Sequence, residues 1–290
     1  MQILCLGPEG TYGHQVAHQI NKRYFGAQGE IVFRKSHEEI LMQLDRAKDS
    51  HAVGVVAIRN SIAGLVMEVV RFWLNPAPSA LRIIGEVDLP IHHQLLVRPG
   101  VSLKDVQSVF SHPQGLAQCE QTLNALGIGE RTPVASTAGA AKMLANHDGK
   151  EAAISSRFCA ELYGLEILQQ NLEDVSGNTT RFHIVANGPG VLPAWKHDLD
   201  LTKMAAVWTV KNEVGALYKV LHEIYEYELG LNMEFIASVQ FGGMNNVAFY
   251  VEMDAPSQEE EQERILQAIS RVAETIVCLG VFPPGMALEE

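Results

Sequence analysis

Residues 177–185, Gly-Asn-Thr-Thr-Arg-Phe-His-Ile-Val, place hydroxyl groups and a guanidinium directly before a β-branched run. The planar donor fork of Arg181 suits a carboxylate, and Asn178 offers an amide close by. A threonine is a weak acid, but a hydroxyl oriented in a dry site can pass a proton to a leaving group. The segment therefore suggests an anion site with Thr180 as proton donor, although Thr-rich strands are also common without a function.

Four other stretches, 7–17, 57–66, 110–119 and 135–141, put polar side chains where a predicted strand gives way to a helix. Each group could serve only as a helix cap or a turn residue. Together they predict a cleft ringed by helix N-termini, which suits a small carboxylate ligand. The candidate ligand-binding residues are Thr11, Asn60, Ser61, Ser111, Gln114, Ser136, Thr137 and Asn178.

The elements that must position these residues alternate between strand and helix over the first 190 residues, which predicts a mainly parallel sheet with helices on both faces. Residues 81–99 are predicted as a pair of strands. The Gly- and Pro-containing stretch 186–203 marks a domain boundary. The pattern after it is βαββαβ, the ferredoxin-like arrangement.

The amino-acid composition limits the classes of partner that the protein could bind. The net charge of −12 disfavours nucleic acid and anionic membranes, so an anionic ligand must be held by local donors. No apolar run approaches the ~20 residues of a membrane span, and the start lacks the features of a signal peptide. The four cysteines are scattered, which indicates free thiols in a reducing cytoplasm. We expect no metal, because His92 and His93 lack a third ligand, and no cofactor, because residues 7–17 match no nucleotide-binding spacing.

The ordered set of motifs resembles the prephenate dehydratase family with a C-terminal regulatory ACT domain. Gly-Pro-Glu-Gly-Thr-Tyr-Gly is similar to the family's GPxGTFS, and Arg-Asn-Ser-Ile-Ala-Gly-Leu-Val to its ENSxxGxV. Ser-His-Pro-Gln-Gly-Leu-Ala-Gln-Cys resembles SHPQALxQC, and Asn-Thr-Thr-Arg-Phe matches NxTRF. Single motifs decide little, but their order and spacing over nearly the whole chain are specific.

The resemblance implies an α/β catalytic region, residues 1–190, with two lobes of the type II periplasmic-binding-protein kind and the active cleft between them. One lobe would hold residues of about 1–78 and 180–190, and the other residues 79–179. A linker, 191–203, would lead to the ACT domain, 204–290. ACT sheets commonly pair, so a homodimer or homotetramer is expected.

The implied reaction converts prephenate to phenylpyruvate, water and carbon dioxide in phenylalanine biosynthesis. Because aromatisation drives it, the site mainly has to position a dianion and protonate the departing ring hydroxyl. By resemblance Thr180 would be the donor and Arg181 its catalytic neighbour. Phe182 would either form the cleft wall or belong to the core.

Three departures from the family pattern raise questions. Arg59 stands where the family has a glutamate, and it either points to solvent or alters how the substrate is held. Gly13 replaces a serine, while Tyr12 gains a hydroxyl. The effector signature survives as Gly215, Ala216 and Leu217, but the family's ESRP reads Ala-Ser-Val-Gln at 237–240. An amino-acid effector needs charged partners, so we predict weak or no feedback by phenylalanine, or another effector.

Two other functions remain open at this point. One is a divergent paralogue that acts on prephenate or another small anion as a non-aromatising decarboxylase or a recruited hydrolase. The other is a ligand sensor without catalysis.

Overall fold

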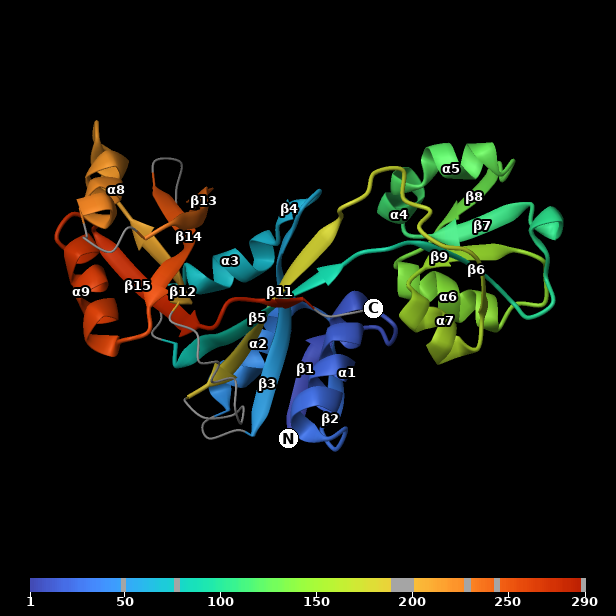
Figure 1. Ribbon diagram of the computed structural model, residues 1–290, viewed down its shortest axis with the longest axis horizontal. Helices are drawn as coiled ribbons and strands as arrows, with labels where there is room; N and C mark the ends of the chain where they lie inside the picture. The colour runs from blue at the N-terminus through green and yellow to red at the C-terminus, as the bar shows by residue number, and fades with distance from the viewer. Residues whose placement is uncertain (48–50, 76–78, 189–200, 227–230, 243–245, 288–290) are drawn as a thin grey trace.

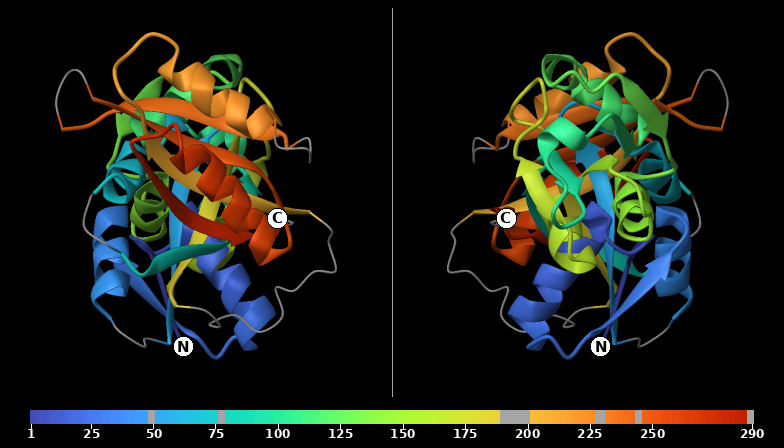
Figure 2. Two further views of the ribbon diagram at one scale, coloured as in Figure 1. Left: turned by 90° about the vertical axis from the view of Figure 1, so that its left-hand side faces the viewer. Right: turned by 90° about the vertical axis from the view of Figure 1, so that its right-hand side faces the viewer.

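The computed structural model describes residues 1–47, 51–75, 79–188, 201–226, 231–242 and 246–287. They form three bodies in a row: a central first lobe, a second lobe on one side of it and a sheet domain on the other (Figure 1). The two end-on views show the sheet domain covering one end of the first lobe and the second lobe covering the other (Figure 2).

The first lobe is built on a mixed sheet in the order β16-β5-β11-β3-β1-β2, with β4 paired to β3. Its strands are β1 (Gln2–Leu6), β2 (Glu30–Arg34), β3 (Ala52–Asn60), β4 (Gly64–Leu65), β5 (Leu81–Pro90), β11 (Thr179–Asn187) and β16 (Met286–Ala287). Its helices are α1 (Tyr12–Phe25), α2 (His37–Arg46) and α3 (Met67–Trp73). β1 and β3 read as continuous apolar runs because both faces of the sheet are covered.

β11 is the strand that returns from the second lobe, and it runs antiparallel to both β3 and β5. The expected mainly parallel arrangement therefore holds for β1, β2 and β3, while β11 is inserted between β3 and β5. This insertion places Thr180 directly opposite Asn60.

The second lobe carries a sheet in the order β10-β6-β9-β7-β8. Its strands are β6 (Gln94–Val97), β7 (Ser108–Ser111), β8 (Glu130–Pro133), β9 (Ala152–Ser155) and β10 (Glu166–Gln169). Its helices are the short 3-10 helix η1 (Leu103–Asp105) and α4 (Pro113–Gln118), α5 (Glu120–Ala125), α6 (Thr137–Ala145) and α7 (Arg157–Tyr163). Helix α6 begins where the Ser136 hydroxyl accepts a hydrogen bond from Gly139 N, as expected of an N-cap.

The pair of strands expected over residues 81–99 is divided between the lobes. β5 pairs with β11 in the first sheet, and β6 pairs with β9 and β10 in the second. The lobe boundary predicted near residue 78 therefore falls one strand too early. The local sequence pattern predicts two successive strands. It does not show that the first of them pairs with β11, a strand far along the chain.

The third sheet has the order β13-β14-β12-β15 and confirms the predicted βαββαβ arrangement. Its elements are β12 (Leu201–Thr209), α8 (Ala216–Glu226), β13 (Met233–Gln240), β14 (Val247–Pro256), α9 (Glu259–Ser270) and β15 (Thr275–Phe282). Residues 191–200 of the predicted linker lie outside the described residues, and 201–203 belong to β12.

The sheet domain and the first lobe share one hydrophobic core. Leu81, Ile83 and Val185 of the first sheet pack in the same buried cluster as Tyr250 and Phe282 of the third. Gly280 of β15 lies so close to β5 that a Cβ there would come within 2.1 Å of Ile83 O. Glycine at this position therefore permits the docking of the two sheets.

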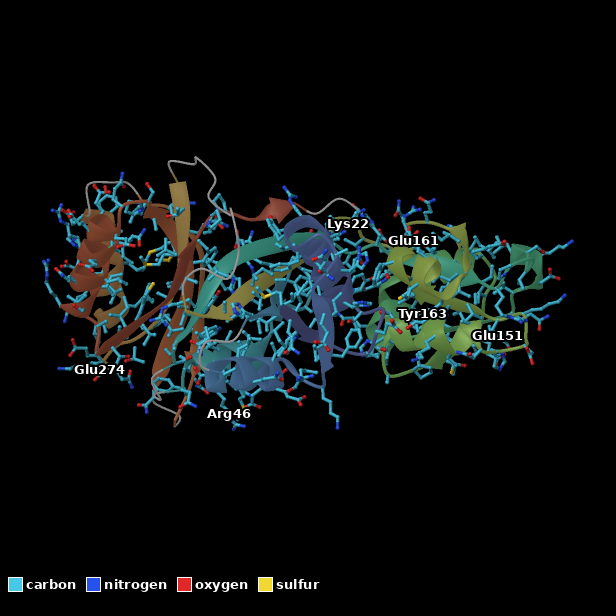
Figure 3. All side chains as sticks on the ribbon, turned by 90° about the horizontal axis from the view of Figure 1, so that it is seen from below. Lys22, Arg46, Glu151, Glu161, Tyr163 and Glu274 are labelled. Carbon is cyan, nitrogen blue, oxygen red and sulfur yellow. The ribbon has the colours of Figure 1, made fainter. Side chains whose placement is uncertain are left out.

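The chain crosses between the lobes twice, and the two crossing segments are joined by backbone hydrogen bonds. Ile91 N donates to Asn178 O at 2.8 Å, and Leu172 N donates to His93 O at 2.8 Å. At the inner faces of the lobes, Tyr163 Oη of α7 donates to Glu9 O at 3.1 Å. Figure 3 shows Tyr163 at this junction. We call these two crossings the hinge, after the connections about which two-lobed proteins commonly close on ligands.

Candidate active site

A cavity of about 390 Å³, here called the central cavity, opens between the two lobes. Strand ends and helix starts from both lobes line it. Of the sequence-predicted residues, its lining includes Thr11, Gly13, Asn60, Gln114, Ser136, Thr137, Asn178, Thr180 and Phe182.

The pair Asn60–Thr180 forms the centre of the site. Asn60 Nδ2 donates to Thr180 Oγ1 at 2.9 Å and to Asn178 Oδ1 at 2.7 Å. Asn60 Oδ1 in turn accepts from Ile62 N and Ala63 N, at 3.0 and 2.8 Å, which fixes the side-chain amide in one orientation. Because the Thr180 oxygen already accepts a hydrogen bond, its own proton is left to donate into the cavity.

Helix N-termini supply the positive end of the site. Thr11 caps α1 by accepting from His14 N at 3.2 Å, and its hydroxyl donates to Leu6 O at 2.7 Å. Ser136 caps α6 in the same way, and both cap residues line the cavity. The dipole of each helix favours a negative group at this end by about 0.3–1 kcal/mol.

Three histidines of the cavity lining were not among the predicted site residues: His37, His93 and His112. His37 opens α2 immediately after its N-cap, and its Nδ1 is buried without a hydrogen-bond partner. Burial lowers the pKa of His37, an effect that nearby Glu68 only partly offsets. The same signal used for the other stretches, a strand end followed by a capped helix, would have identified this residue.

His93 lies at the hinge and lines the central cavity beside Tyr12. Its Nε2 is 2.8 Å from Gln118 Oε1, and its Nδ1 is 3.5 Å from Tyr12 Oη. Burial lowers the pKa of His93 more than its contacts with Gln118 and Glu173 raise it. The extra hydroxyl of Tyr12, noted from the sequence, thus contacts the hinge.

The lining is neutral in its formal charges. Among the described residues that line the central cavity there is no Asp, Glu, Lys or Arg. Apolar groups of Leu6, Ala57, Ile91 and Phe182 complete the wall. An anion in this cavity would be held by backbone N–H groups, hydroxyls, amides and imidazoles, which is consistent with capture by local donors in an acidic protein.

Arg181 lies on the other face of β11. Neighbouring side chains of a strand point to opposite faces, so Thr180 and Phe182 face the cavity and Arg181 faces the sheet domain. Its Nε and Nη2 both bind the Asp88 carboxylate at 2.8 Å, and its Nη1 lies 3.2 Å from Glu252 Oε2. Burial lowers the pKa of Arg181, but Asp88 and Glu86 more than offset this and raise it above its usual range. Arg181, predicted to bind the ligand, is therefore not part of the lining of the central cavity.

Arg59 also points away from the central cavity, and it is not directed simply to solvent. Its Nη2 lies 3.3 Å from Glu252 Oε2, and its Cζ lies 4.3 Å from the centroid of the Phe235 ring. Arg59 and Arg181 line a second cavity of about 360 Å³, the rear cavity, between the first lobe and β13. The positive charge of Arg59, where the family has a negatively charged glutamate, therefore affects the contact between the first lobe and the sheet domain. It does not change the wall of the central cavity.

Two further predicted residues have structural contacts. Ser61 is exposed at the rear cavity, where its Oγ accepts from Thr179 N at 2.9 Å. Ser111 is buried, and its hydroxyl donates to Ile154 O at 2.9 Å. Ser61 joins the turn after β3 to β11, and Ser111 joins β7 to β9, so both support the site from outside the cavity.

The predicted effector residues are in the sheet domain. Gly215 has φ +81° and precedes α8, which starts at Ala216 and includes Leu217. Residues 237–240 lie in β13, the edge strand of the third sheet.

The architecture and the site together define a two-lobed α/β protein of the periplasmic-binding-protein type, with a polar, formally uncharged cavity between the lobes and an appended ferredoxin-like domain. The family model for prephenate dehydratase matches residues 3–189. The chain belongs to the prephenate dehydratase family.

Relatives and solved structures agree with this assignment. Arogenate dehydratase/prephenate dehydratase 6 of Arabidopsis thaliana is 32% identical over 247 residues, covering 80% of this chain and 58% of the relative. This chain thus spans little more than half the length of that relative. The bifunctional N-acyl-homoserine lactone acylase/prephenate dehydratase of Komagataeibacter europaeus is 34% identical over 235 residues, 80% of each chain. A prephenate dehydratase from Arthrobacter aurescens, solved in complex with L-Phe, matches with a TM-score of 0.81 at 25% identity, covering 98% of this chain and 90% of that one.

In the part of the chain that the structure describes, no helix is both long and apolar enough to cross a membrane.

Proposed function

We propose that this protein is a prephenate dehydratase that converts prephenate to phenylpyruvate. The observation that carries the proposal is the hydrogen bond from Asn60 Nδ2 to Thr180 Oγ1 in a cavity between two hinged lobes. This bond occupies one lone pair of the hydroxyl and leaves its proton available for a bound ligand.

The reaction requires three coupled changes. The ring carboxylate leaves as carbon dioxide, and its bonding electrons enter the ring. The C–O bond to the ring hydroxyl breaks, and the departing oxygen takes the Thr180 proton and leaves as water. Thr180 then recovers a proton from solvent. The gain in aromaticity drives these steps, so orientation and one proton donor suffice.

Because the described lining of the central cavity contains no carboxylate, it favours a keto acid over the corresponding amino acid. Prephenate carries two carboxylates, which the N-termini of α1 and α6 and the neutral donors can bind. Arogenate carries an ammonium group in place of the keto oxygen. A desolvated ammonium needs a carboxylate partner, and the described lining contains no Asp or Glu. We therefore propose a higher kcat/KM for prephenate than for arogenate.

Thr180→Val tests the assignment of the proton donor. Valine keeps the shape of threonine but removes the hydroxyl, so we expect kcat for phenylpyruvate formation to fall by about 10²–10⁴-fold. Thr180→Ser, which keeps the hydroxyl, is the matched control and should remain far more active than the valine variant. Full turnover by Thr180→Val would contradict the proposal.

The same incubation separates the other functions. A product of prephenate that lacks an aromatic ring would indicate a non-aromatising decarboxylase. Saturable binding of prephenate without any product would indicate a sensor.

A recruited hydrolase is the remaining alternative, and the name of the Komagataeibacter europaeus relative makes an N-acyl-homoserine lactone the substrate to test. Such a reaction needs a nucleophile activated by a base. The hydroxyls of Thr11, Ser136 and Thr180 have their hydrogen bonds with backbone groups or with Asn60. We therefore expect release of the acyl chain to be slow compared with formation of phenylpyruvate.

The remaining expectations belong to the same proposal. The third domain would act as an ACT domain, and the protein would work in the cytoplasm as a homodimer or homotetramer through the exposed edge of β13. Static light scattering of the purified protein measures the assembly, and a monomeric mass would contradict it.

Weak effector binding is a separate expectation. Residues 237–240 offer no charged side chain to the ammonium or carboxylate of phenylalanine. Titration calorimetry with phenylalanine should therefore show little heat, and micromolar binding would contradict this expectation.

A further inference from the structure

A cluster of charged side chains joins the sheet domain to the back of the first lobe, on the face of β11 opposite the central cavity. We call it the interdomain cluster. The first lobe contributes Arg59, Glu86, Asp88 and Arg181, and the sheet domain contributes Lys203, Glu234 and Glu252. With three cations and four carboxylates, the cluster is nearly balanced in charge.

Glu252 of β14 is the member that reaches both strands of the proposed active site. It is fully buried. Its Oε2 lies 3.2 Å from Arg181 Nη1 and 3.3 Å from Arg59 Nη2. Its Oε1 accepts from Tyr250 Oη at 2.6 Å and lies 3.5 Å from His183 Nε2. One carboxylate of the sheet domain therefore binds a guanidinium from β11 and another from β3.

The two arginines are the immediate neighbours of the proton-donating pair. Thr180 is opposite Asn60 in the β11–β3 register, and Arg181 is opposite Arg59. The register shifts directly after Arg181, where Phe182 pairs with Ala57. A shift of this kind leaves the pairing locally irregular, so the position of Thr180 relative to Asn60 depends on contacts beyond the backbone ladder.

We propose that Glu252 is a positioning residue, which holds Arg59 and Arg181 together and thereby fixes the Asn60–Thr180 hydrogen bond on the opposite face of the same two strands. The catalytic part of this inference rests on the proposed function. The structural part, that a carboxylate of the sheet domain sets the geometry of an amide–hydroxyl pair in the central cavity, does not.

The contacts of Lys203 provide the internal comparison. Lys203 Nζ binds Glu86 Oε1 at 2.7 Å and Glu234 Oε2 at 2.6 Å. It therefore joins the same two bodies through a buried ion pair, but it binds neither guanidinium directly. Glu86 and Glu234 lie between it and Arg181, each with a carboxylate oxygen 3.4 Å from Arg181 Nη1. A role in docking alone predicts similar effects for Glu252 and Lys203, whereas a positioning role predicts different ones.

The test compares Glu252→Gln with Lys203→Met in the full-length chain. Glutamine keeps the size of the side chain and removes the charge that both guanidiniums share. We expect kcat for prephenate to fall by about 10- to 100-fold in Glu252→Gln, as small displacements of reacting groups typically cause, with little change in KM. Lys203→Met should lose thermal stability but retain its kcat. Equal losses of kcat in the two variants would overturn the proposal.

A second readout does not depend on turnover. The side-chain amide of Asn60 can be followed by ¹⁵N NMR, assigned with Asn60→Asp. We expect its resonance to shift in Glu252→Gln and to stay in place in Lys203→Met. If wild-type protein forms no phenylpyruvate but the Asn60 resonance responds as expected, the proposed function fails and the positioning role stands. An unmoved resonance in Glu252→Gln refutes the positioning role.

A third variant covers the case in which Glu252→Gln does not fold. Arg59→Met removes one of the two guanidiniums from a partly exposed site and leaves the Arg181–Asp88 pair intact. We expect it to shift the Asn60 resonance and to lower kcat in the same direction, while Arg59→Lys restores part of both. An unchanged resonance in a folded Arg59→Met protein also refutes the proposal.

Discussion

Thr180 and Arg181 are adjacent in the chain, yet they face different parts of the molecule. The hydroxyl faces the central cavity, while the guanidinium lies among Asp88, Glu86 and Glu252. With Glu234, four carboxylates surround this arginine, so its charge is already compensated. It therefore stabilises the fold and the junction between the bodies, from which the proposed positioning of Thr180 follows.

Arg181→Met tests this assignment. Removing one partner from a buried ion cluster leaves uncompensated carboxylates, so we expect the free energy of unfolding to drop by about 3–5 kcal/mol. Urea denaturation measures it, with the exposed Arg264→Met of α9 as the control. If instead the stability is unchanged and KM for prephenate rises steeply, Arg181 contacts the substrate.

The polar residues of the cleft could be predicted from sequence because each follows a strand and opens a helix or turn. That rule identified Thr11, Asn60 and Ser136, whereas Thr180 was identified from the hydroxyls and guanidinium that stand directly before a β-branched run. It could not place Arg59 or Arg181, since their partner Glu252 is more than seventy positions away from Arg181 in the chain. The direction of a strand residue follows from alternation only once one neighbour is known to face the cavity.

At the scale of the secondary-structure elements, helix α2 begins at the wall of the central cavity. Its first residue is the buried His37. Burial lowers the pKa of its imidazole, and a positive charge at a helix N-terminus would be unfavourable. In the folded protein the pKa of His37 is below the ordinary value of 6.5. The unfolded chain then binds more protons below pH 6.5, so stability decreases as the pH falls through that value.

His37→Phe should make the free energy of unfolding less dependent on pH between 6.5 and 5. The carboxylates with lowered pKa, such as Glu252 and Glu173, keep their contribution until the pH approaches their unfolded value of 4.5, so they do not interfere in this window. Urea titrations at several pH values measure the slope, with the exposed His18→Gln of α1 as the control. An unchanged slope in His37→Phe would show that His37 does not titrate in this way.

The element order was predictable from the alternation of strand and helix patterns, and so was the βαββαβ unit after residue 200. The sheet membership of β5 was not. Its sequence, Leu-Arg-Ile-Ile-Gly-Glu-Val-Asp-Leu-Pro, describes a strand, but its neighbours β11 and β16 come from residues about 90 and 200 positions later.

On the scale of the whole molecule, the sheet domain and the first lobe are one packed unit. Their shared core and the interdomain cluster couple the far end of the chain to the strands that carry Asn60 and Thr180. Gly280 lies at the closest approach between the two sheets.

Gly280→Ala tests that coupling. A methyl group 2.1 Å from Ile83 O cannot be accommodated without moving β15 away from β5, so we expect the sheet domain to shift outward. Small-angle X-ray scattering should show a larger radius of gyration, and kcat should decrease in parallel. Gly129→Ala is the matched control, because nothing lies within 4 Å of a Cβ there. A Gly280→Ala protein with unchanged dimensions and activity would contradict the coupling.

The short strand β16 has a consequence for the folding of the chain during its translation. Met286 and Ala287 pair with Val87 and Asp88 in the first sheet, and Phe282 fills the core beside Ile83. During translation the N-terminal half of the chain leaves the ribosome before β15 and β16 are made. In a nascent chain this edge of β5 therefore stays unpaired until synthesis reaches residue 287, and over that interval it is open to aggregation.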